Sequence, residues 1–156
     1  MLLLATILVF TLDSCSPEKR FKKEEMELIY DFLAKNPDLA FEQKESGMYY
    51  LEILQGSGEF AKKSDTAYVK YAGKFLNGTI FDTNIGTTDT LIFLVDRGLL
   101  LPGFDEGITY MKKGGKATFI LPSDLAYGIR GFYSMTGYSI NGYTPLLFDV
   151  TLVDLK

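Results

Sequence analysis

Four segments of the chain alternate apolar and other side chains with a period of two residues: MYYLEIL at 48–54, TAYVKYAGKF at 66–75, KATFIL at 116–121 and LLFDVTLVDL at 146–155. In the last of them Phe148, Val150 and Leu152 fall on one side. Because successive side chains of a strand point to opposite faces, this alternation predicts strands that bury one face and expose the other. The chain must therefore fold around a sheet with one covered side.

A single short helix is predicted at 102–113, where Phe104, Ile108 and Met111 recur with helical spacing. Two acidic residues stand in its first turn and two lysines in its last, which suits the helix dipole, and Gly114 is placed to end it. The sequence NGT at 77–79 is typical of a tight turn between adjacent strands. Together these elements predict an α+β domain, an antiparallel β-sheet wrapped around one short α-helix.

A second helix is expected nearer the amino terminus, at 22–35. Met26, Ile29 and Leu33 repeat with helical spacing there, and NPD at 36–38 ends the pattern. Such an amphipathic helix would pack on the domain or space it from a membrane. Dimerisation through its apolar stripe is the sharper alternative.

The first twelve residues are an apolar run that is too short to cross a bilayer and has the length of a signal-peptide core. Leu12-Asp13-Ser14-Cys15 follows and resembles a bacterial lipobox. We expect residues 1–14 to be a lipoprotein signal peptide, Cys15 to be the lipidated residue, and 15–45 to form a tether with the amphipathic helix. A buried strand with a free cysteine is the alternative.

The residue inventory excludes several classes of function. The chain has no histidine and one cysteine, which removes histidine-based catalysis, Ser-His and Cys-His nucleophiles, zinc fingers and disulfide frameworks. Its net charge of -4 opposes nucleic-acid binding. The glycine-rich stretches lack the phosphate-binding patterns, so we expect no nucleotide cofactor and no metal.

Residues 128–145, GIRGFYSMTGYSINGYTP, are rich in glycine, serine and tyrosine and show no regular period. Long irregular segments inside compact domains are more often binding loops than fillers. We expect a binding loop here, with a mobile surface loop as the alternative.

Three separated blocks carry a resemblance to a known family: VKYAGKFLNGTIFDTN, then FLVDRGLLLPGFDEGITYMKKGGKATFILPSDLAYGIRG, then TPLLFDVTLVDL. In this order they resemble the FKBP family of peptidyl-prolyl cis-trans isomerases, over residues 46–156. The resemblance implies an apolar pocket between the sheet and the short helix. Eleven residues would line it: Tyr71, Phe81, Asp82, Leu91, Phe93, Leu100, Leu101, Phe104, Tyr127, Ile140 and Phe148.

The same resemblance implies roles for three polar side chains, which we treat as the catalytic set. The Tyr127 hydroxyl and the backbone N–H of Leu101 would donate to substrate carbonyls, while Asp82 would accept a hydrogen bond from Tyr71 and hold the pocket wall. The remaining pocket residues would bind substrate, with Phe104 as the floor. Rotation about an Xaa-Pro bond needs no nucleophile, which agrees with a chain that lacks histidine.

We therefore expect an isomerase of the bacterial cell envelope, lipid-anchored and facing the periplasm or exterior, that acts on proline-containing polypeptides and binds macrolide inhibitors. One alternative is a catalytically weak chaperone or binding module that uses the same pocket. Another is an assembly factor in which the helix and anchor matter most. On the isomerase interpretation, activity should survive removal of residues 16–45.

Overall fold

The computed structural model describes residues 16–133 and 138–156, and its centre is an antiparallel sheet of seven strands. The sheet order is β1-β2-β8-β11-β4-β5, and β6 also pairs with β4. The strands are β1 (Glu42–Gln43), β2 (Tyr49–Leu54), β4 (Thr66–Phe75), β5 (Ile80–Thr83), β6 (Leu91–Leu94), β8 (Lys116–Leu121) and β11 (Leu146–Leu155). The four segments predicted as strands are thus strands of one sheet.

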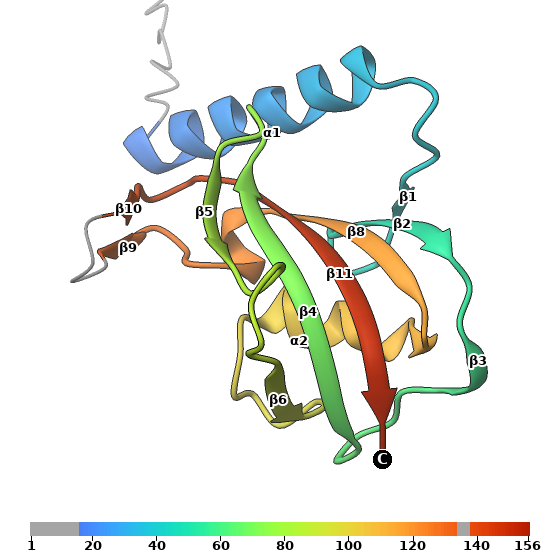
Figure 1. Ribbon diagram of the computed structural model, residues 1–156. Coiled ribbons are helices and arrows are strands. Elements are labelled where there is room, and N and C mark those ends of the chain that lie inside the picture. The colour runs from blue at the N-terminus through green and yellow to red at the C-terminus, as the bar shows by residue number, and fades with distance from the viewer. Residues whose placement is uncertain (1–15, 134–137) are drawn as a thin grey trace, which may run out of the picture.

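The other elements are helices and two small two-stranded sheets. They are α1 (Pro17–Lys35), α2 (Pro102–Thr109), the short 3-10 helix η1 (Ser123–Leu125), β3 (Ser57–Phe60) paired with β7 (Lys112–Lys113), and β9 (Phe132–Tyr133) paired with β10 (Ser139–Ile140). Figure 1 shows the sheet curving around α2 on one side while α1 crosses the other. The predicted α+β arrangement, with a preceding amino-terminal helix, is confirmed.

The inner face of the sheet and α2 share the main apolar core. In the middle of the sheet Phe148 of β11 stands opposite Phe119 of β8 on one side and Gly73 of β4 on the other. Phe104 and Ile108 of α2 pack into the same buried cluster. The apolar face of the sheet, which the period-two alternation predicted, thus packs on α2. This contact buries the apolar faces of the sheet and of the helix together.

The outer face is covered by α1. Ile29 is buried there against Tyr49, Ile120 and Leu147 of the sheet, as expected for a helix that packs on the domain. The helix begins at Pro17 and not at Lys22 as predicted. Ser16 caps it by accepting a hydrogen bond from the Lys19 N–H at 3.4 Å, and proline is favoured in the first turn that follows such a cap.

The predicted extent of α2 was also wrong at its end. The helix ends at Thr109, and Lys112–Lys113, predicted as its last turn, form β7 against β3. Chain segments pack tightly at this point: a side chain at Gly56 would meet the carbonyl oxygens of both lysines at 2.4 Å. Pairing with a distant strand therefore overrides the local helical pattern.

The turn predicted at NGT joins β4 to β5. Gly78 has a φ of +88°, which favours glycine, and its N–H donates to the carbonyl of Phe75. The Asn77 side chain accepts from the Thr79 N–H at 2.9 Å. This turn sends β5 back beside β4 and so places Phe81 and Asp82 near Tyr71.

The predicted irregular segment at 128–145 contains a short hairpin, because β9 pairs with β10. Residues 1–15 and 134–137 lie outside the described residues, so the signal peptide and the lipidation of Cys15 stay predictions. Within the described ranges, neither helix has the length and apolar character needed to span a bilayer.

Candidate functional site

An apolar pocket of about 190 Å³ opens between the inner face of the sheet and the amino-terminal end of α2. Nine residues line it: Tyr71, Phe81, Asp82, Leu91, Leu100, Leu101, Phe104, Tyr127 and Phe148. All nine belong to the set that the sequence predicted. They come from β4, β5, β6, β11, the start of α2 and the turn after η1, so the pocket exists only once these elements have assembled.

Aromatic rings in edge-to-face contact form the floor and walls. Phe104 is 3% exposed and forms the floor, with its ring centroid 5.8 Å from that of Tyr71 and 5.3 Å from that of Phe148. Phe81 meets Phe148 at 5.8 Å and 89°. Aromatic rings favour this geometry because the positive edge of one ring faces the negative face of the next. The walls are therefore packed and geometrically defined.

Gly73 lets two of these walls come together. A Cβ at this position would lie 2.7 Å from Cζ of Phe81 and 2.9 Å from Cε1 of Phe148. Both rings would have to move to accept a methyl group. The strand interior thus carries glycine where the pocket needs close approach of two rings.

A phenol-carboxylate pair closes one side. The Tyr71 hydroxyl donates to Asp82 Oδ2 at 2.6 Å, as predicted. Burial, followed by this hydrogen bond, raises the pKa of Tyr71 above its usual range, so the phenol keeps its proton at all ordinary pH values. Asp82 is half-buried and serves as a fixed acceptor.

Two further donors border the pocket. Burial raises the pKa of the Tyr127 hydroxyl, with smaller contributions from Tyr138 and Asp82, so this group also remains a donor. Leu101 precedes the first residue of α2, where backbone N–H groups lack helical partners. Among the described residues, no acceptor is paired with the Leu101 N–H.

The family model for FKBP-type peptidyl-prolyl cis-trans isomerases matches residues 57–153, well over half of the chain. The chain belongs to this family. The match contains all nine pocket residues, and the family of isomerases is the one that the sequence blocks resembled.

Individual relatives agree. A probable FKBP-type peptidyl-prolyl cis-trans isomerase of Haemophilus influenzae is 35% identical over 134 residues, covering 86% of this chain and 52% of the relative. The crystal structure of FkpA from Escherichia coli matches with a TM-score of 0.68 and 31% identity over 89% of this chain and 64% of that one. The chain spans about half the length of the Haemophilus relative.

A third match has nearly the same extent as the chain. The crystal structure of a peptidyl-prolyl cis-trans isomerase from Pseudomonas syringae pv. tomato is 26% identical with a TM-score of 0.72, covering 90% of this chain and 97% of that one. The fold therefore recurs in a solved isomerase almost all of which this chain matches.

Two residues predicted to line the FKBP pocket lie behind its surface. Phe93 is 6% exposed and packs against Phe104, with ring centroids 6.2 Å apart. Ile140 is fully buried in β10. Both support the pocket through the core and are not part of its lining.

Two residues that contact or support the site were not predicted to do so from the sequence. Tyr138 packs its ring against Phe81, with centroids 6.0 Å apart, and extends the aromatic wall into the loop. Asn84 accepts from the Tyr71 N–H at 2.8 Å and donates to the Val69 carbonyl at 3.0 Å, which fixes the β4 backbone beside the pocket. Asn84 follows β5 directly, a position where a strand-end amide could have been suspected.

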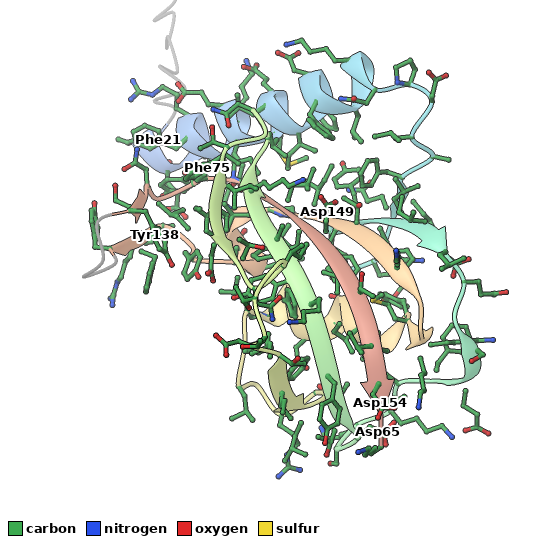
Figure 2. The ribbon with its side chains drawn as sticks, viewed as in Figure 1. Phe21, Asp65, Phe75, Tyr138, Asp149 and Asp154 are labelled. Atoms are coloured by element: carbon green, nitrogen blue, oxygen red, sulfur yellow. The ribbon has the colours of Figure 1, made fainter. Side chains whose placement is uncertain are left out.

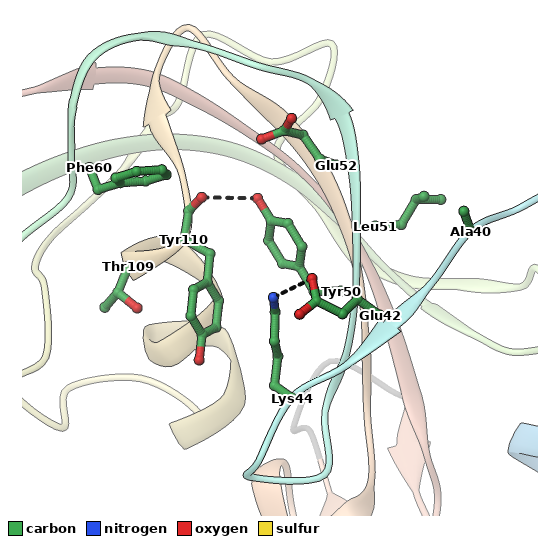
Figure 3. A pocket seen from close by; sticks show the side chains of 9 residues that line it. All are labelled: Ala40, Glu42, Lys44, Tyr50, Leu51, Glu52, Phe60, Thr109 and Tyr110. Atoms are coloured by element: carbon green, nitrogen blue, oxygen red, sulfur yellow. Dashed lines mark hydrogen bonds and ion pairs between the residues drawn. The ribbon is translucent and has the colours of Figure 1, made fainter.

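A larger cavity of about 610 Å³ lies away from the FKBP pocket, between β2 and the carboxyl end of α2 (Figure 3). Its centre already holds a cation of the chain. Lys44 Nζ lies 5.2 Å from the Tyr50 ring centroid and 4.7 Å from that of Tyr110, and it pairs with Glu42 at 2.6 Å. Lys44 is therefore already engaged by Glu42 and by two aromatic rings of the chain itself.

No group of three or more possible metal ligands occurs within 16–133 and 138–156.

Proposed function

We propose that this chain catalyses cis-trans rotation about Xaa-Pro bonds in the pocket floored by Phe104. The observation that carries the proposal is a small, ring-walled cavity whose polar groups are hydrogen-bond donors and a fixed acceptor, with no nucleophile. Membership of the FKBP isomerase family supports it.

The geometry suits a reaction that makes and breaks no covalent bond. The barrier of about 18–20 kcal/mol comes from amide resonance, which places partial negative charge on the imide oxygen of the planar ground state. Transfer of the prolyl ring into an apolar cavity removes water from that oxygen and disfavours the charge-separated planar form relative to the twisted transition state. The aromatic walls would supply this environment.

Donors at the rim would hold the substrate in place. The Tyr127 hydroxyl and the Leu101 N–H would donate to carbonyl oxygens on either side of the prolyl bond. A thousandfold acceleration needs about 4 kcal/mol, and one or two hydrogen bonds that improve in the transition state add to the desolvation effect. Asp82 would keep the Tyr71 ring in the wall and is a positioning group.

The cellular setting is part of the same proposal. The apolar run at 1–12 and the Leu12–Cys15 sequence support a lipid-anchored protein of the cell envelope that assists folding of proline-containing polypeptides. Macrolide inhibitors would compete for the same apolar cavity.

The test is the cis-to-trans rate of short Xaa-Pro peptides with the full chain in a mild detergent. Tyr127→Phe should lower kcat/KM about tenfold, since one hydrogen bond used in the transition state is worth about 1.4 kcal/mol. Tyr133→Phe is the matched control, because this tyrosine is 73% exposed on the same loop and does not line the pocket. If the folded parent protein accelerates cis-to-trans rotation for no Xaa-Pro peptide, whatever residue precedes proline, the proposed isomerase activity is refuted.

A second function is favoured by the exposed apolar residues of the loop beside the pocket. Ile129 is 58% exposed, Tyr133 73% and Phe132 37%. Such a surface could hold apolar segments of unfolded chains with little catalysis. Peptide binding in the pocket without acceleration would support this binding module over the isomerase.

A further inference from the structure

Glu25 is a buried carboxylate that the pocket chemistry does not use. It lies on α1, is 1% exposed, and points towards the start of η1. Its Oε1 accepts from the Ser123 N–H, and its Oε2 accepts from Ser123 Oγ at 3.0 Å and from Lys22 Nζ at 3.2 Å. Both carboxylate oxygens are therefore satisfied by donors from two elements.

This burial specifies where α1 docks. A carboxylate removed from water loses several kcal/mol of solvation unless donors replace it. Ser123 offers such donors, and Lys22 extends the cluster by pairing with Asp124 at 2.5 Å. A shift of α1 by one turn would leave Glu25 without these partners. The helix is thus held in one register against the segment that contains η1.

Ser123 begins the turn that carries Tyr127. Its carbonyl accepts from the Ala126 N–H at 2.9 Å and from the Gly128 N–H at 2.8 Å. These two amides belong to the residues on either side of Tyr127. The chain of hydrogen bonds therefore runs from Glu25 through one residue to both neighbours of the pocket tyrosine.

A second contact joins α1 to the same turn. Phe21 stacks on Tyr143, with ring centroids 5.3 Å apart, and the Tyr143 N–H donates to the Gly128 carbonyl at 3.1 Å. Figure 2 shows Phe21 at the end of α1 that faces the β9–β10 hairpin. The turn is thus held on α1 at two points, one polar and one aromatic.

We propose that Glu25 is a positioning residue of the site, which sets the Tyr127 hydroxyl over the pocket through its hydrogen bonds to Ser123. The amino-terminal helix is then part of the catalytic unit. This inference rests on the proposed isomerase function. It also replaces the expectation that activity survives removal of residues 16–45, because that truncation removes Glu25.

The decisive experiment is a double-mutant cycle on the full chain. Glu25→Ala should lower kcat/KM for an Xaa-Pro peptide about tenfold when Tyr127 is present, and less than twofold in the Tyr127→Phe background, because the hydroxyl to be positioned is already gone. Glu25→Gln keeps the shape and one acceptor and should lose less than Glu25→Ala. Glu27→Ala is the control, an exposed carboxylate on the same helix, and should leave kcat/KM unchanged.

Equal losses in both backgrounds, or no loss, would overturn the inference, since a general destabilisation does not depend on the Tyr127 hydroxyl. Hydrogen exchange tests the same link without activity. Glu25→Ala should speed exchange at the Ala126 and Gly128 amides more than at amides of β11, and unchanged exchange there would refute the link. If the parent protein does not accelerate Xaa-Pro rotation but Glu25→Ala still speeds amide exchange at Ala126 and Gly128, only the proposed function is refuted.

Discussion

The two faces of the sheet are covered in different ways. The inner face belongs to an apolar cluster of 18 buried residues that includes α2, whereas the outer cluster under α1 has four. On the inside, position is set by interlocking rings and aliphatic chains. On the outside, few apolar contacts are available, and the buried hydrogen bonds of Glu25 add the specificity that they lack.

Each face of the sheet serves a separate purpose. Apolar burial is the main favourable term in folding and is not directional, so a large cluster supplies stability. A buried carboxylate adds little net stability, but it requires one particular arrangement of donors around it. The inner face should therefore determine whether the chain folds, and the outer face where the turn beside the pocket lies.

The largest loss of stability is expected from truncating a side chain of the inner core. Phe119 is fully buried and its ring packs 5.6 Å from that of Tyr50 and 6.1 Å from that of Phe104. Phe119→Ala should lower the free energy of unfolding by about 4 kcal/mol through lost burial and a residual cavity. Urea denaturation measures this, with the exposed Phe60→Ala as control. A loss for Phe119→Ala no larger than that for Phe60→Ala would refute the assignment.

A smaller loss is expected on the outer face. Ile29→Ala should lower the free energy of unfolding by about 2 kcal/mol, because it removes a smaller side chain from a smaller buried cluster. Amide exchange should quicken in α1 before it does in β11. The neighbouring Leu28, 55% exposed, provides the control Leu28→Ala with little change. Simultaneous release of α1 and β11 would mean that the two faces form one cooperative unit.

The smallest effect is expected at two adjacent tyrosines, whose side chains lie on opposite faces of the sheet. Burial raises the pKa of Tyr50 to about 12, while Tyr49 has a pKa raised mainly by burial under α1. A raised pKa means that stability is present below the unfolded value near 10 and is lost as the pH rises through the folded value. Between pH 10 and 12 the parent should lose stability.

In urea titrations across this range, the free energy of unfolding should fall less steeply with pH in Tyr50→Phe than in Tyr49→Phe. Tyr50 also donates to the Tyr110 carbonyl at 3.2 Å, so its variant should be less stable at neutral pH. Identical profiles for the two variants would contradict the larger rise in the pKa of Tyr50.

Much of the inner face could be predicted from the sequence. The alternation in β4 and β11 identified their buried sides because strand geometry forces a period of two. The nine pocket residues followed from the family resemblance, which carried positions across the whole sheet. Phe93 and Ile140 were placed in the lining wrongly, since alternation and resemblance separate faces but not the depth of a side chain.

The outer face was harder to predict. The Ser16-Pro17 start of α1 carries the usual signals of a capped helix, and we interpreted it as a tether because the apolar stripe begins later. Glu25 stands four residues from both Phe21 and Ile29, so helical spacing places it on the apolar row of α1, unlike the exposed Glu24 and Glu27. The spacing does not tell which donors such a carboxylate meets. Its partner Ser123 lies 98 positions away, so only the folded chain brings them together.

The Glu25–Ser123 contact also bears on how this unit could be moved between proteins. The family match begins at residue 57. A fragment that starts near that point, or at residue 46, would contain all nine residues that line the pocket. It would remove Glu25, so the donors of Ser123 would face water and the turn that carries Tyr127 would lose its contact with α1. On the proposed isomerase function, the smallest transferable unit therefore begins at Ser16, the residue that caps α1, and keeps the whole helix.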